Sequence, residues 1–438
     1  MVESTLRVDW NGVEVGTLIM GAGRVLRFRY SPEWLNHPNR RSISLSLPLG
    51  RNEYEGAAVW SFFSNLLPDN VRALERISEI FRLPPGGTFA FLEAMGRDCI
   101  GAARFHAEGS TPPEPCGMKS RMLSEEDIEE MLLSLGGFPL GMTPDEDFRL
   151  TIPGAQMKTA LLRLNGEWRL PLEGAPTTHI LKLPIGSMHG NTIDFSESCE
   201  NEWLCLEIAR AFGLPAARAD LADFGSVRAI AVERFDRIPS KRHPGVILRL
   251  PAEDMCQALG VPPHQKYETD GGPGIGRIMK LLEQSAERER DRHVFMASQV
   301  LMWLLDSPDA HAKNYSILLR RGDCFELAPL YDILSAAPLT ASGELSERRL
   351  KLAMALIGKN RHDRMSDVQP RHFISTAQAV GFPESEMREI LQHFADSASK
   401  VIEDLQKRLP ADFPETTSRP IFEILRKRAG MLARFLES

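Results

Sequence analysis

Cysteines and long apolar runs are scarce in this sequence of 438 residues. The six cysteines are scattered without a C-x-x-C pair, which argues against a zinc site or a disulfide framework and predicts free thiols. No uninterrupted stretch of about 18 apolar residues occurs, so we expect no membrane-spanning helix and no membrane partner. The start, MVESTLRVDW, lacks the basic residues and apolar core of a signal peptide, which predicts a cytoplasmic location.

An excess of basic residues is also missing. The chain has 52 Lys and Arg against 59 Asp and Glu, a net charge of −7. Proteins that coat nucleic acid by themselves are usually basic, so direct coating is not expected, although contact with DNA through a partner stays possible. The remaining composition, 43% hydrophobic and 25% charged, is typical of globular proteins, and the length predicts two or three domains or subdomains.

The N-terminal part of the sequence has β patterns followed by helical ones. Residues 5–30 predict a hairpin around Asn11-Gly12, and SISLSLPL (42–49) alternates polar and apolar residues as a half-buried strand does. Helices are expected over 57–67 and 71–83. The segment EGSTPPEPCG (108–117) is rich in Pro and Gly without periodicity, and it predicts a linker.

The rest of the sequence is first rich in strands and then mainly helical. After a helix at 124–135, strands are expected at 148–152, 159–164, 167–172, 179–184 and 227–235, and a helix over 198–212 ends at Gly213. From about residue 275, helical periodicity covers 277–286, 290–306, 385–409 and 419–437.

This order predicts an α+β protein with two lobes. We expect an N-terminal β-containing subdomain at 1–110, a strand-rich lobe at 118–240 and an all-helical lobe at 241–438. A strand-rich lobe followed by a helical lobe leaves a cleft between them, and nucleotides are often held in such clefts.

The stretch LLDSPDAHAKNYSILL (304–319) places many polar residues between two apolar segments. Asp309 and Asn314 have the spacing D-x-x-x-x-N that protein-kinase-type sites use for the base and a magnesium ligand. Asp332 follows an apolar segment, where a second magnesium carboxylate is expected, although the triplet is Asp-Ile-Leu and not Asp-Phe-Gly. The alternative is a capped turn followed by an aspartate that caps a helix.

Two upstream segments fit the same chemistry. Lys182 lies among apolar residues in the strand HILKLP, where its ammonium group can meet the α- and β-phosphates of ATP or instead extend to the surface. Glu202 in the next helix is a possible partner, with Glu200 and Glu207 as rivals, and a solvated helix face is the alternative for each of them.

Two glycine-containing segments and one strand end are also candidates. TIPGAQMK (151–158) contains Gly154, which permits a close backbone approach to phosphates, or it is a plain hairpin turn. GGPGIG (271–276) is discounted because it precedes a helix far from the strands and its Pro removes an amide donor. In VERFDR (232–237), backbone groups of Glu233 and Phe235 can meet adenine, unless the segment is a strand end with surface ion pairs.

The sequence resembles the bacterial HipA toxin kinases over nearly its whole length. The matching stretches, in order, include FFSNLLPDN, GAQMKTALLR, PTTHILKLPIG, VRAIAVERFDR, KYETDGGPGI, DAHAKNYS and PLYDILSA. The resemblance implies a Ser/Thr protein kinase with a two-lobed fold related to protein and phosphoinositide kinases. It also implies ATP and Mg²⁺ as cofactors.

The resemblance also assigns roles to residues. Asp309 would be the catalytic aspartate, and Asn314 and Asp332 would bind magnesium. Nucleotide contacts are implied for a larger set, which comprises Pro153, Gly154, Ala155, Gln156, Met157, Lys158, Lys182, Glu233, Arg234, Phe235, Asp309, Ala310, His311, Tyr331 and Asp332.

Partners and regulation follow from the same resemblance. The family implies phosphorylation of an aminoacyl-tRNA synthetase, glutamate–tRNA ligase for the nearest relatives, which stalls translation and produces dormant cells. It implies a small helix-turn-helix antitoxin, HipB, through which operator DNA is reached. The family implies self-silencing by phosphorylation of a serine just before the glycine-containing loop 153–158 (the Gly loop), where this chain has Thr151. It also implies glycine at the position of Ala310.

Two other functions were weighed against an active kinase. The first is a non-catalytic, pseudokinase-like co-repressor that acts only through a DNA-binding antitoxin, but such a protein does not need Lys182, Asp309, Asn314 and Asp332 together. The second is a metal hydrolase with Asp309, His311 and Asp332 as ligands, which would leave the Gly loop and Lys182 without a purpose.

Overall fold

The computed structural model describes residues 3–84, 87–110, 118–188 and 192–438. These residues form two compact units, each gathered from separate stretches of the chain. The first unit comprises 1–183, 222–264 and 316–325, and the second comprises 184–221, 265–315 and 326–438. The predicted segments 1–110, 118–240 and 241–438 are each continuous in sequence, and their boundaries stay predictions. Most of the predicted linker, residues 111–117, lies outside the described residues.

A five-stranded antiparallel sheet begins the first unit. Its order is β4-β3-β2-β1-β5, with β1 (Ser4–Trp10), β2 (Val13–Met20), β3 (Leu26–Tyr30), β4 (Glu53–Glu55) and β5 (Ala103–Ala107). Asn11 and Gly12 connect β1 and β2 with φ values of 48° and 87°, which confirms the predicted hairpin. Helix α2 (Ala57–Ser64) packs on this sheet, because the ring of Phe63 lies 5.7 Å from that of Phe28 and 5.8 Å from that of Phe105. The other helices here are α1 (Pro32–Asn36), α3 (Val71–Ile80) and α4 (Thr88–Met95).

The strand predicted at 42–49 was wrong, because this segment is a series of turns. Its serine hydroxyl groups bond to the local backbone: Ser44 Oγ accepts from the Ser46 amide at 3.1 Å, and Ser42 Oγ accepts from the Leu49 amide at 3.0 Å. Such side-chain bonds offer the backbone an alternative to a ladder of strand hydrogen bonds. Alternation of serine with apolar residues therefore misled the periodicity argument.

A six-stranded sheet with the order β12-β13-β9-β7-β8-β6 carries the candidate phosphate-binding residues. It contains β6 (Ser120–Met122), β7 (Lys158–Leu164), β8 (Glu167–Pro171), β9 (His179–Lys182), β12 (Ala219–Phe224) and β13 (Val227–Glu233), and α5 (Glu125–Ser134) follows β6 in sequence. Four of the five strands predicted in this region are confirmed. The exception is 148–152, where the Thr151 amide donates to the carbonyl of Asp98 at 2.9 Å and no strand forms.

Further short elements, mainly of the first unit, lie later in the chain. They are β14 (Arg237–Pro239), β15 (Ile247–Arg249), β16 (Ala252–Asp254), α7 (Met255–Ala258), β17 (Ser316–Leu319) and β18 (Phe325–Leu327). β14 pairs with β15, and β16 pairs with β17.

A buried cluster of charged residues connects distant parts of the first unit. The Asp98 carboxylate accepts hydrogen bonds from Arg237 and Arg249, each at 2.9 Å, and from the Thr177 hydroxyl at 2.7 Å. Arg234 binds Asp236 through two nitrogens, at 3.0 and 2.8 Å. All five charged side chains of this cluster are at most 3% exposed. The three guanidinium groups hold the pKa of Asp98 well below its usual range despite the opposing effect of burial.

A buried glutamate in the same unit makes stability depend on pH. Glu253 is fully buried, and its Oε1 accepts from the Leu45 amide at 2.9 Å. Burial raises its pKa to about 8 from the ordinary 4.5. The folded state therefore keeps this proton over a pH range in which the unfolded state releases it, and stability falls as the pH rises from about 5 to about 8.

Glu253→Gln should remove this dependence. We expect the wild type to lose up to about 1.4 kcal/mol of unfolding free energy for each pH unit in this range from this one group, and the variant to lose markedly less. Urea unfolding at pH 5.5, 6.5 and 7.5 measures the difference, with the exposed Glu75→Gln as the control. Equal slopes for the wild type and Glu253→Gln would contradict the assignment.

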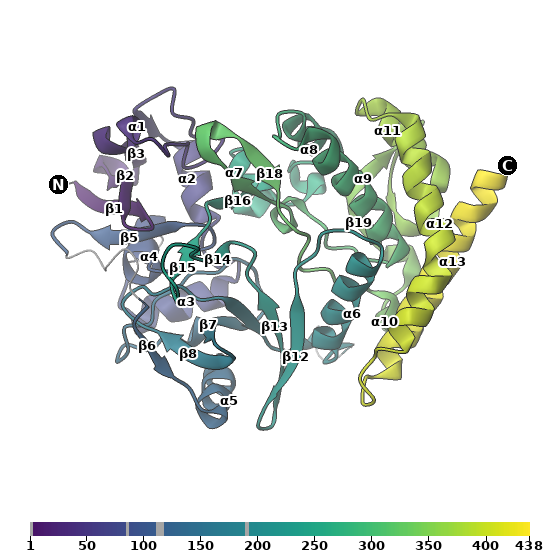
Figure 1. Ribbon diagram of the computed structural model, residues 1–438, viewed down its shortest axis with the longest axis horizontal. Helices are drawn as coiled ribbons and strands as arrows, with labels where there is room; N and C mark the ends of the chain where they lie inside the picture. Colours follow the sequence, from purple (N-terminus) through teal and green to yellow (C-terminus); the bar gives the residue numbers. More distant parts are fainter. Residues whose placement is uncertain (1–2, 85–86, 111–117, 189–191) are drawn as a thin grey trace. The chain divides into compact units, whose positions relative to one another are not determined.

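The second unit consists mainly of helices. They are α6 (Ser198–Ala211), α8 (Ile275–Leu282), α9 (Arg288–Leu304), α10 (Ala337–Ala341), α11 (Pro370–Ala379), α12 (Glu384–Gln406) and α13 (Glu415–Glu437). The two longest, α12 and α13, lie side by side and pack against each other (Figure 1). Helix α6 is followed by Gly213 with φ 82°, as predicted.

The expectation of an all-helical C-terminal part was wrong. A hairpin of β19 (Lys351–Ile357) and β20 (Arg361–Arg364) lies in the second unit, which also has β10 (Gly186–Met188) paired with β11 (Ile193–Phe195). Residues 352–356 of β19 are all buried, and α11 packs against this strand. A short, continuously apolar run fits a buried strand as well as a helix, so periodicity alone did not decide it.

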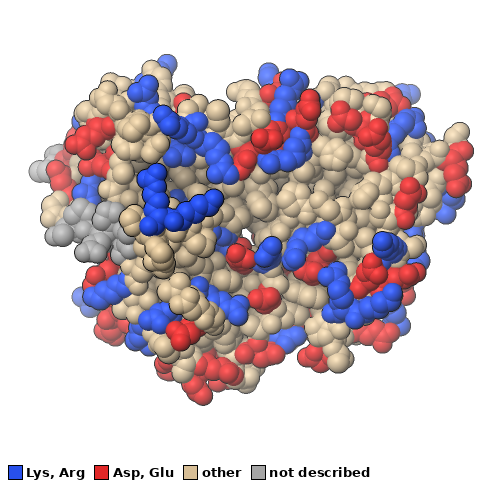
Figure 2. All heavy atoms as spheres, in the orientation of Figure 1, with Lys and Arg blue, Asp and Glu red and all other residues tan. Residues whose placement is uncertain are grey.

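The distribution of charge on the surface and the hydropathy of the helices agree with the composition. Acidic and basic side chains are interspersed on the face drawn in Figure 2. Within the described ranges, no helix is long and apolar enough to cross a membrane. Five cysteines are free, four of them buried, and Cys116 lies outside the described residues.

Candidate active site

The Gly loop, residues 153–158, leads into β7, and its backbone carbonyl groups differ from its amides in their hydrogen bonding. Four of its carbonyl groups accept hydrogen bonds from the protein. The Pro153 carbonyl accepts from Lys158 Nζ at 2.9 Å, and the Gly154 carbonyl accepts from the Asp69 amide at 3.2 Å. The Ala155 carbonyl accepts from Asn70 Nδ2 at 3.1 Å, and the Met157 carbonyl accepts from the Leu183 amide at 3.1 Å. Among the residues that the structure describes, no acceptor is found for the amides of residues 154–157.

This difference in hydrogen bonding makes the loop a candidate anion site. Successive backbone amides without acceptors are the groups that phosphate-binding loops offer to phosphate oxygens. Gly154 has φ 104°, a conformation that residues with a Cβ rarely adopt, so glycine is needed for this backbone path. The loop is not the hairpin turn that was the alternative, because the residues directly before it, 147–153, form no strand.

Two lysines lie opposite each other beside the loop. Lys158 on β7 and Lys182 on β9 are direct partners in the antiparallel ladder, so their side chains share one face of the sheet. They are only 7% and 6% exposed. Like charges at directly opposite positions are destabilising, and burial makes this worse, so two buried ammonium groups favour a site for an anion. The alternative in which Lys182 extends to the surface does not fit its burial.

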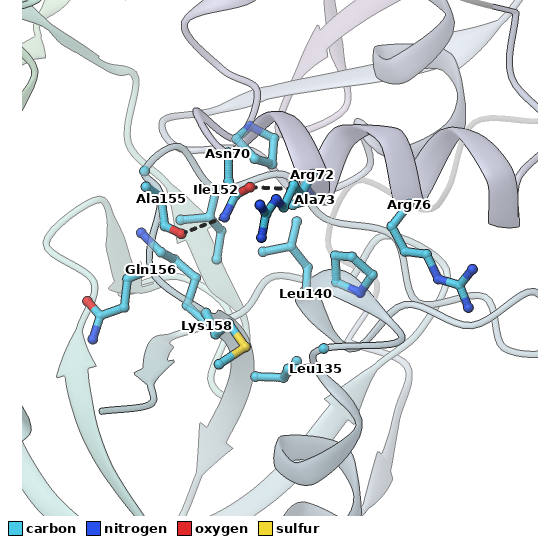
Figure 3. Close-up of a pocket in the computed structure, with 15 residues that line it drawn as sticks. Asn70, Arg72, Ala73, Arg76, Leu135, Leu140, Ile152, Ala155, Gln156 and Lys158 are labelled. Carbon is cyan, nitrogen blue, oxygen red and sulfur yellow. Dashed lines mark hydrogen bonds between the residues drawn. The ribbon is translucent and has the colours of Figure 1, made fainter. Parts of the chain in front are cut away.

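Asn70 connects this loop to helix α3. Its Oδ1 accepts from the Ala73 amide at 3.2 Å and so caps the helix, while its Nδ2 donates to the Ala155 carbonyl (Figure 3). A pocket of about 150 Å³ lies between α3 and the loop, with Gln156 and Lys158 among its lining residues. One side chain therefore fixes both the start of a helix and the position of the Gly loop, and sequence reasoning gave it no role.

The residues predicted to meet adenine end strand β13. Glu233 is the last residue of this strand and pairs with His179 of β9, and Phe235 follows two positions later. Arg234, between them, is different because its guanidinium group lies in the buried Asp98 cluster. Its amide donates to Thr178 and its carbonyl accepts from Arg237. The structure thus gives Arg234 a structural role, while the roles of Glu233 and Phe235 stay predictions.

Thr151, the predicted self-phosphorylation site, is fully buried. Its Oγ1 donates to the Leu66 carbonyl at 2.5 Å, and its amide donates to the carbonyl of Asp98. In this conformation the hydroxyl is not accessible, so phosphorylation would require the segment before the Gly loop to leave its place.

In the second unit, the loop after α9 holds Asp309 and Asn314 close together. Asn314 Nδ2 donates to the Asp309 carbonyl at 2.7 Å, and the amide of Asn314 donates to the His311 carbonyl at 2.9 Å. The short 3-10 helix Ala312–Asn314 makes this compact path possible. Ala310 is buried and does not have positive φ, so its methyl group causes no left-handed strain at the position where the resemblance implied glycine. The predicted juxtaposition of Asp309 and Asn314 therefore exists on one loop.

Asp332 is connected to this loop by its neighbours. The hydroxyl group of Tyr331 donates to the Lys313 carbonyl at 2.8 Å. Asn201 of α6 exchanges two hydrogen bonds of 2.8 Å with the backbone of Ser335, and the Ala336 amide donates to the carbonyl of Asp306 at 2.9 Å. Asp332 itself has φ 57°, which is uncommon for a residue with a side chain and is typical of functional or tightly constrained positions.

The side-chain oxygens of Asn314 and Asp332 fit magnesium as ligands. Mg²⁺ takes oxygen ligands, usually one or two carboxylates with water and phosphate oxygens. Because the Asn314 amide nitrogen is bound to the Asp309 carbonyl, its side-chain oxygen is left as the ligand group, and Asp332 supplies a carboxylate. The burial of His311 lowers its pKa, while the carboxylates of Asp309 and Asp332 act in the opposite direction, so both are within electrostatic range of this ring.

The hydrolase alternative loses its support. Over the described ranges of the chain, no group of three or more His, Cys, Asp and Glu side chains is placed to hold a metal ion. His311 Nε2 lies 3.8 Å from Asp309 Oδ1, and its buried Nδ1 has no hydrogen-bond partner among the residues that the structure describes. The imidazole packs edge to face against the ring of Tyr267, and among the described residues it does not converge with two carboxylates on one ion.

The three glutamates of α6 that the sequence offered as partners of Lys182 differ in their surroundings, and the pairing itself stays a prediction. Glu202 and Glu200 on α6 are 1% and 7% exposed, whereas the Glu207 carboxylate pairs with Arg210 at 2.7 Å and lies 3.8 Å from Arg408. Glu207 is therefore occupied in surface ion pairs.

Comparisons with known families decide where this chain belongs. The model of the HipA-like C-terminal domain matches residues 150–402, and that of the HipA N-terminal domain matches residues 6–106. The chain belongs to the HipA family. The C-terminal match includes every candidate site residue named above except Asn70, which lies in the N-terminal match.

Individual relatives agree with this HipA assignment. The putative kinase Y4mE of Sinorhizobium fredii is 33% identical over 411 residues, covering 92% of this chain and 93% of that protein. The serine/threonine-protein kinase toxin HipA of Shewanella oneidensis is 31% identical over 347 residues, covering 76% of this chain and 75% of that protein.

A solved structure confirms the fold. HipA from the Shewanella oneidensis complex of HipA, HipB and operator DNA superposes with a TM-score of 0.81, covering 99% of this chain and 100% of that chain at 23% identity. The predicted HipA membership and the α+β, kinase-like fold class are thus confirmed.

Proposed function

We propose that this HipA family member is a Ser/Thr protein kinase that transfers the γ-phosphate of ATP to a protein hydroxyl group. The observation that carries the proposal is the Gly loop beside the buried pair Lys158 and Lys182. Four of its carbonyl groups are bound by the protein, whereas the amides of residues 154–157 have no acceptor among the described residues. A binding-only protein has no need of such an anion site. Relatives named as kinases support the same function.

Each residue has a defined part in the proposed reaction. The loop amides and the two lysines bind the phosphates of ATP, and Asn314 and Asp332 would hold Mg²⁺, which neutralises developing charge on the phosphates. Asp309 accepts the proton of the substrate hydroxyl group. The substrate oxygen forms a bond to Pγ, the bond between Pγ and the β–γ bridging oxygen breaks, and ADP leaves with the electron pair.

Incubation of the purified protein with γ-labelled ATP and candidate aminoacyl-tRNA synthetases tests the proposal. Magnesium-dependent transfer of label to a protein is the expected result. No transfer to any synthetase, to general protein substrates or to the chain itself, under conditions in which ATP binds, would favour the second candidate, a non-catalytic co-repressor.

The finer parts of the proposal concern target and partner. Glutamate–tRNA ligase is the proposed substrate, and its inhibition would arrest translation and promote dormancy. A HipB-like helix-turn-helix antitoxin is the proposed partner, which would bring the protein to operator DNA. The support is that the structural neighbour was solved in complex with HipB and operator DNA. Labelling of the chain but not of this ligase would leave the kinase standing and remove the proposed substrate.

Self-silencing at Thr151 is a further part of the proposal. Since the hydroxyl of Thr151 is buried against the Leu66 carbonyl, a phosphate of about −1.5 to −2 charges does not fit there and would expel the Gly loop. A phosphopeptide map of the labelled chain tests this step, and a map that contains labelled peptides but none with Thr151 would exclude it.

Asn70 offers a test of how the loop is held. Asn70→Asp keeps the acceptor that caps α3 but loses the donor to the Ala155 carbonyl. We expect the KM for ATP to rise about 3- to 10-fold with little change in melting temperature, because one hydrogen bond that positions the loop is lost. Steady-state kinetics measures this change, and Asn70→Ala, which also loses the cap, should lower the melting temperature in addition. An unchanged KM in both variants would show that Asn70 does not position the loop.

A further inference from the structure

One phenol group holds the carboxylate of the proposed catalytic aspartate. The hydroxyl of Tyr267, 42 positions earlier in the sequence, donates to Asp309 Oδ1 at 2.5 Å. The Asp309 side chain is 48% exposed. In the part of the chain that the structure describes, no other hydrogen bond reaches this carboxylate, since His311 Nε2 at 3.8 Å is too far to form one. The orientation of Asp309 therefore depends on Tyr267.

Tyr267 is itself held firmly by its surroundings. Its ring meets that of His311 edge to face, with centroids 4.8 Å apart. Its carbonyl accepts from the amides of Asp270 at 3.1 Å and Gly272 at 2.9 Å, which closes a tight turn. A Cβ on Gly272 would lie 2.0 Å from the carbonyl oxygen of Gln265, so this position needs glycine. The glycines of KYETDGG thus form a support for Tyr267 and not a phosphate loop.

The next residue connects this support to the β19–β20 hairpin. Glu268 Oε2 accepts from the Ala355 amide of β19 at 2.7 Å, and its Oε1 lies 2.6 Å from the guanidinium group of Arg361 in β20. The Lys266 carbonyl, on the other side of Tyr267, accepts from the Ala312 amide at 3.3 Å. Residues 266–268 therefore join the hairpin at one end to the catalytic loop at the other.

We propose that Tyr267 is a positioning residue for phosphoryl transfer, an inference that rests on the proposed kinase function. By donating to Oδ1, the phenol fixes the rotamer of Asp309 and leaves Oδ2 to accept the proton of the substrate hydroxyl. Glu268 keeps the tyrosine in place through its two contacts with the hairpin. Tyr267 does not touch the reacting atoms and acts only through Asp309.

Tyr267→Phe removes only the hydroxyl group and gives the test. A hydrogen bond to a charged group is lost, so kcat should fall about 10- to 100-fold, while the KM for ATP stays within about twofold of wild type. Tyr54→Phe, which removes a phenol hydroxyl from β4 in the other unit, is the matched control and should leave both constants unchanged. A variant kcat equal to or above that of wild type would overturn the proposal, and a rise would show that the phenol blocks Asp309.

Two further readouts separate this inference from general effects. Because the phenol acts through Asp309, adding Tyr267→Phe to Asp309→Asn should change the residual rate by less than about twofold, whereas a general structural defect would lower it again. Crystal structures of wild type and Tyr267→Phe give a readout that does not depend on activity. We expect one Asp309 rotamer in the wild type and several in the variant. A single unchanged rotamer in both would overturn the inference. This outcome is independent of whether the protein transfers phosphate, so it is distinct from a failure of the kinase proposal.

Discussion

Asp309→Asn is expected to lower kcat for phosphoryl transfer by about 100- to 10,000-fold, because an amide cannot accept the proton of the substrate hydroxyl group. The substitution keeps an oxygen that can accept from Tyr267, and the Asp309 backbone carbonyl still accepts from Asn314. Melting temperature and ATP affinity should therefore stay near those of wild type. Steady-state kinetics with a labelled protein substrate, together with calorimetric titration of ATP, measures both effects.

Asp412→Asn is the matched control for this prediction. Asp412 is an exposed aspartate of the same unit, between α12 and α13, and the same chemical change there should leave kcat unchanged. If Asp309→Asn retained more than about a tenth of wild-type kcat, Asp309 would not be the general base.

Asp98→Ala is expected to have the largest effect on stability. It would leave the guanidinium group of Arg249 buried without its carboxylate partner, and it would take one of two carboxylate partners from Arg237, which keeps Asp236. Removing one member of a buried ion pair typically costs about 3 to 5 kcal/mol. We therefore expect the free energy of unfolding at pH 7 to fall by at least about 3 kcal/mol. Urea unfolding monitored by tryptophan fluorescence measures the difference, and Asp145→Ala, at an exposed position of the same unit, is the control.

The pH dependence provides a second check on Asp98. Its pKa is depressed in the folded state, so its contribution to stability is present above the unfolded pKa of about 4 and is lost as the pH falls below it. The difference in unfolding free energy between wild type and Asp98→Ala should be full at pH 7 and shrink below about pH 4. A constant difference at every pH would contradict the ionised state of Asp98.

Features that depend on near neighbours in the sequence were predictable. Asp309 and Asn314 are five positions apart, so one loop brings them together whatever the rest of the chain does. The hairpin at Asn11 and Gly12 follows from the positive φ that such a turn requires. Helices α12 and α13 have long 3.6-residue periodicity, which local reasoning detects well.

Features that depend on distant partners were not predictable from the residues alone. Arg234 sits at the end of a strand, and its place in a buried cluster with Asp98 depends on a contact across 136 positions. Tyr267 has no sequence signal as the partner of Asp309, because their contact spans 42 positions. SISLSLPL has the alternation of a strand, and only the hydroxyl bonds of its serines show why no strand forms.

One experiment tests the central claim, that the Gly loop with Lys182 and the loop with Asp309 act on the same nucleotide. It is a crystal structure of the chain with a non-hydrolysable ATP analogue and Mn²⁺, in which anomalous scattering locates the metal. The expected result is a triphosphate bound by Lys182 and the amides of residues 154–157, with manganese between its phosphates and the oxygens of Asn314 and Asp332. Nucleotide bound elsewhere, or manganese that touches neither Asn314 nor Asp332, would contradict the claim.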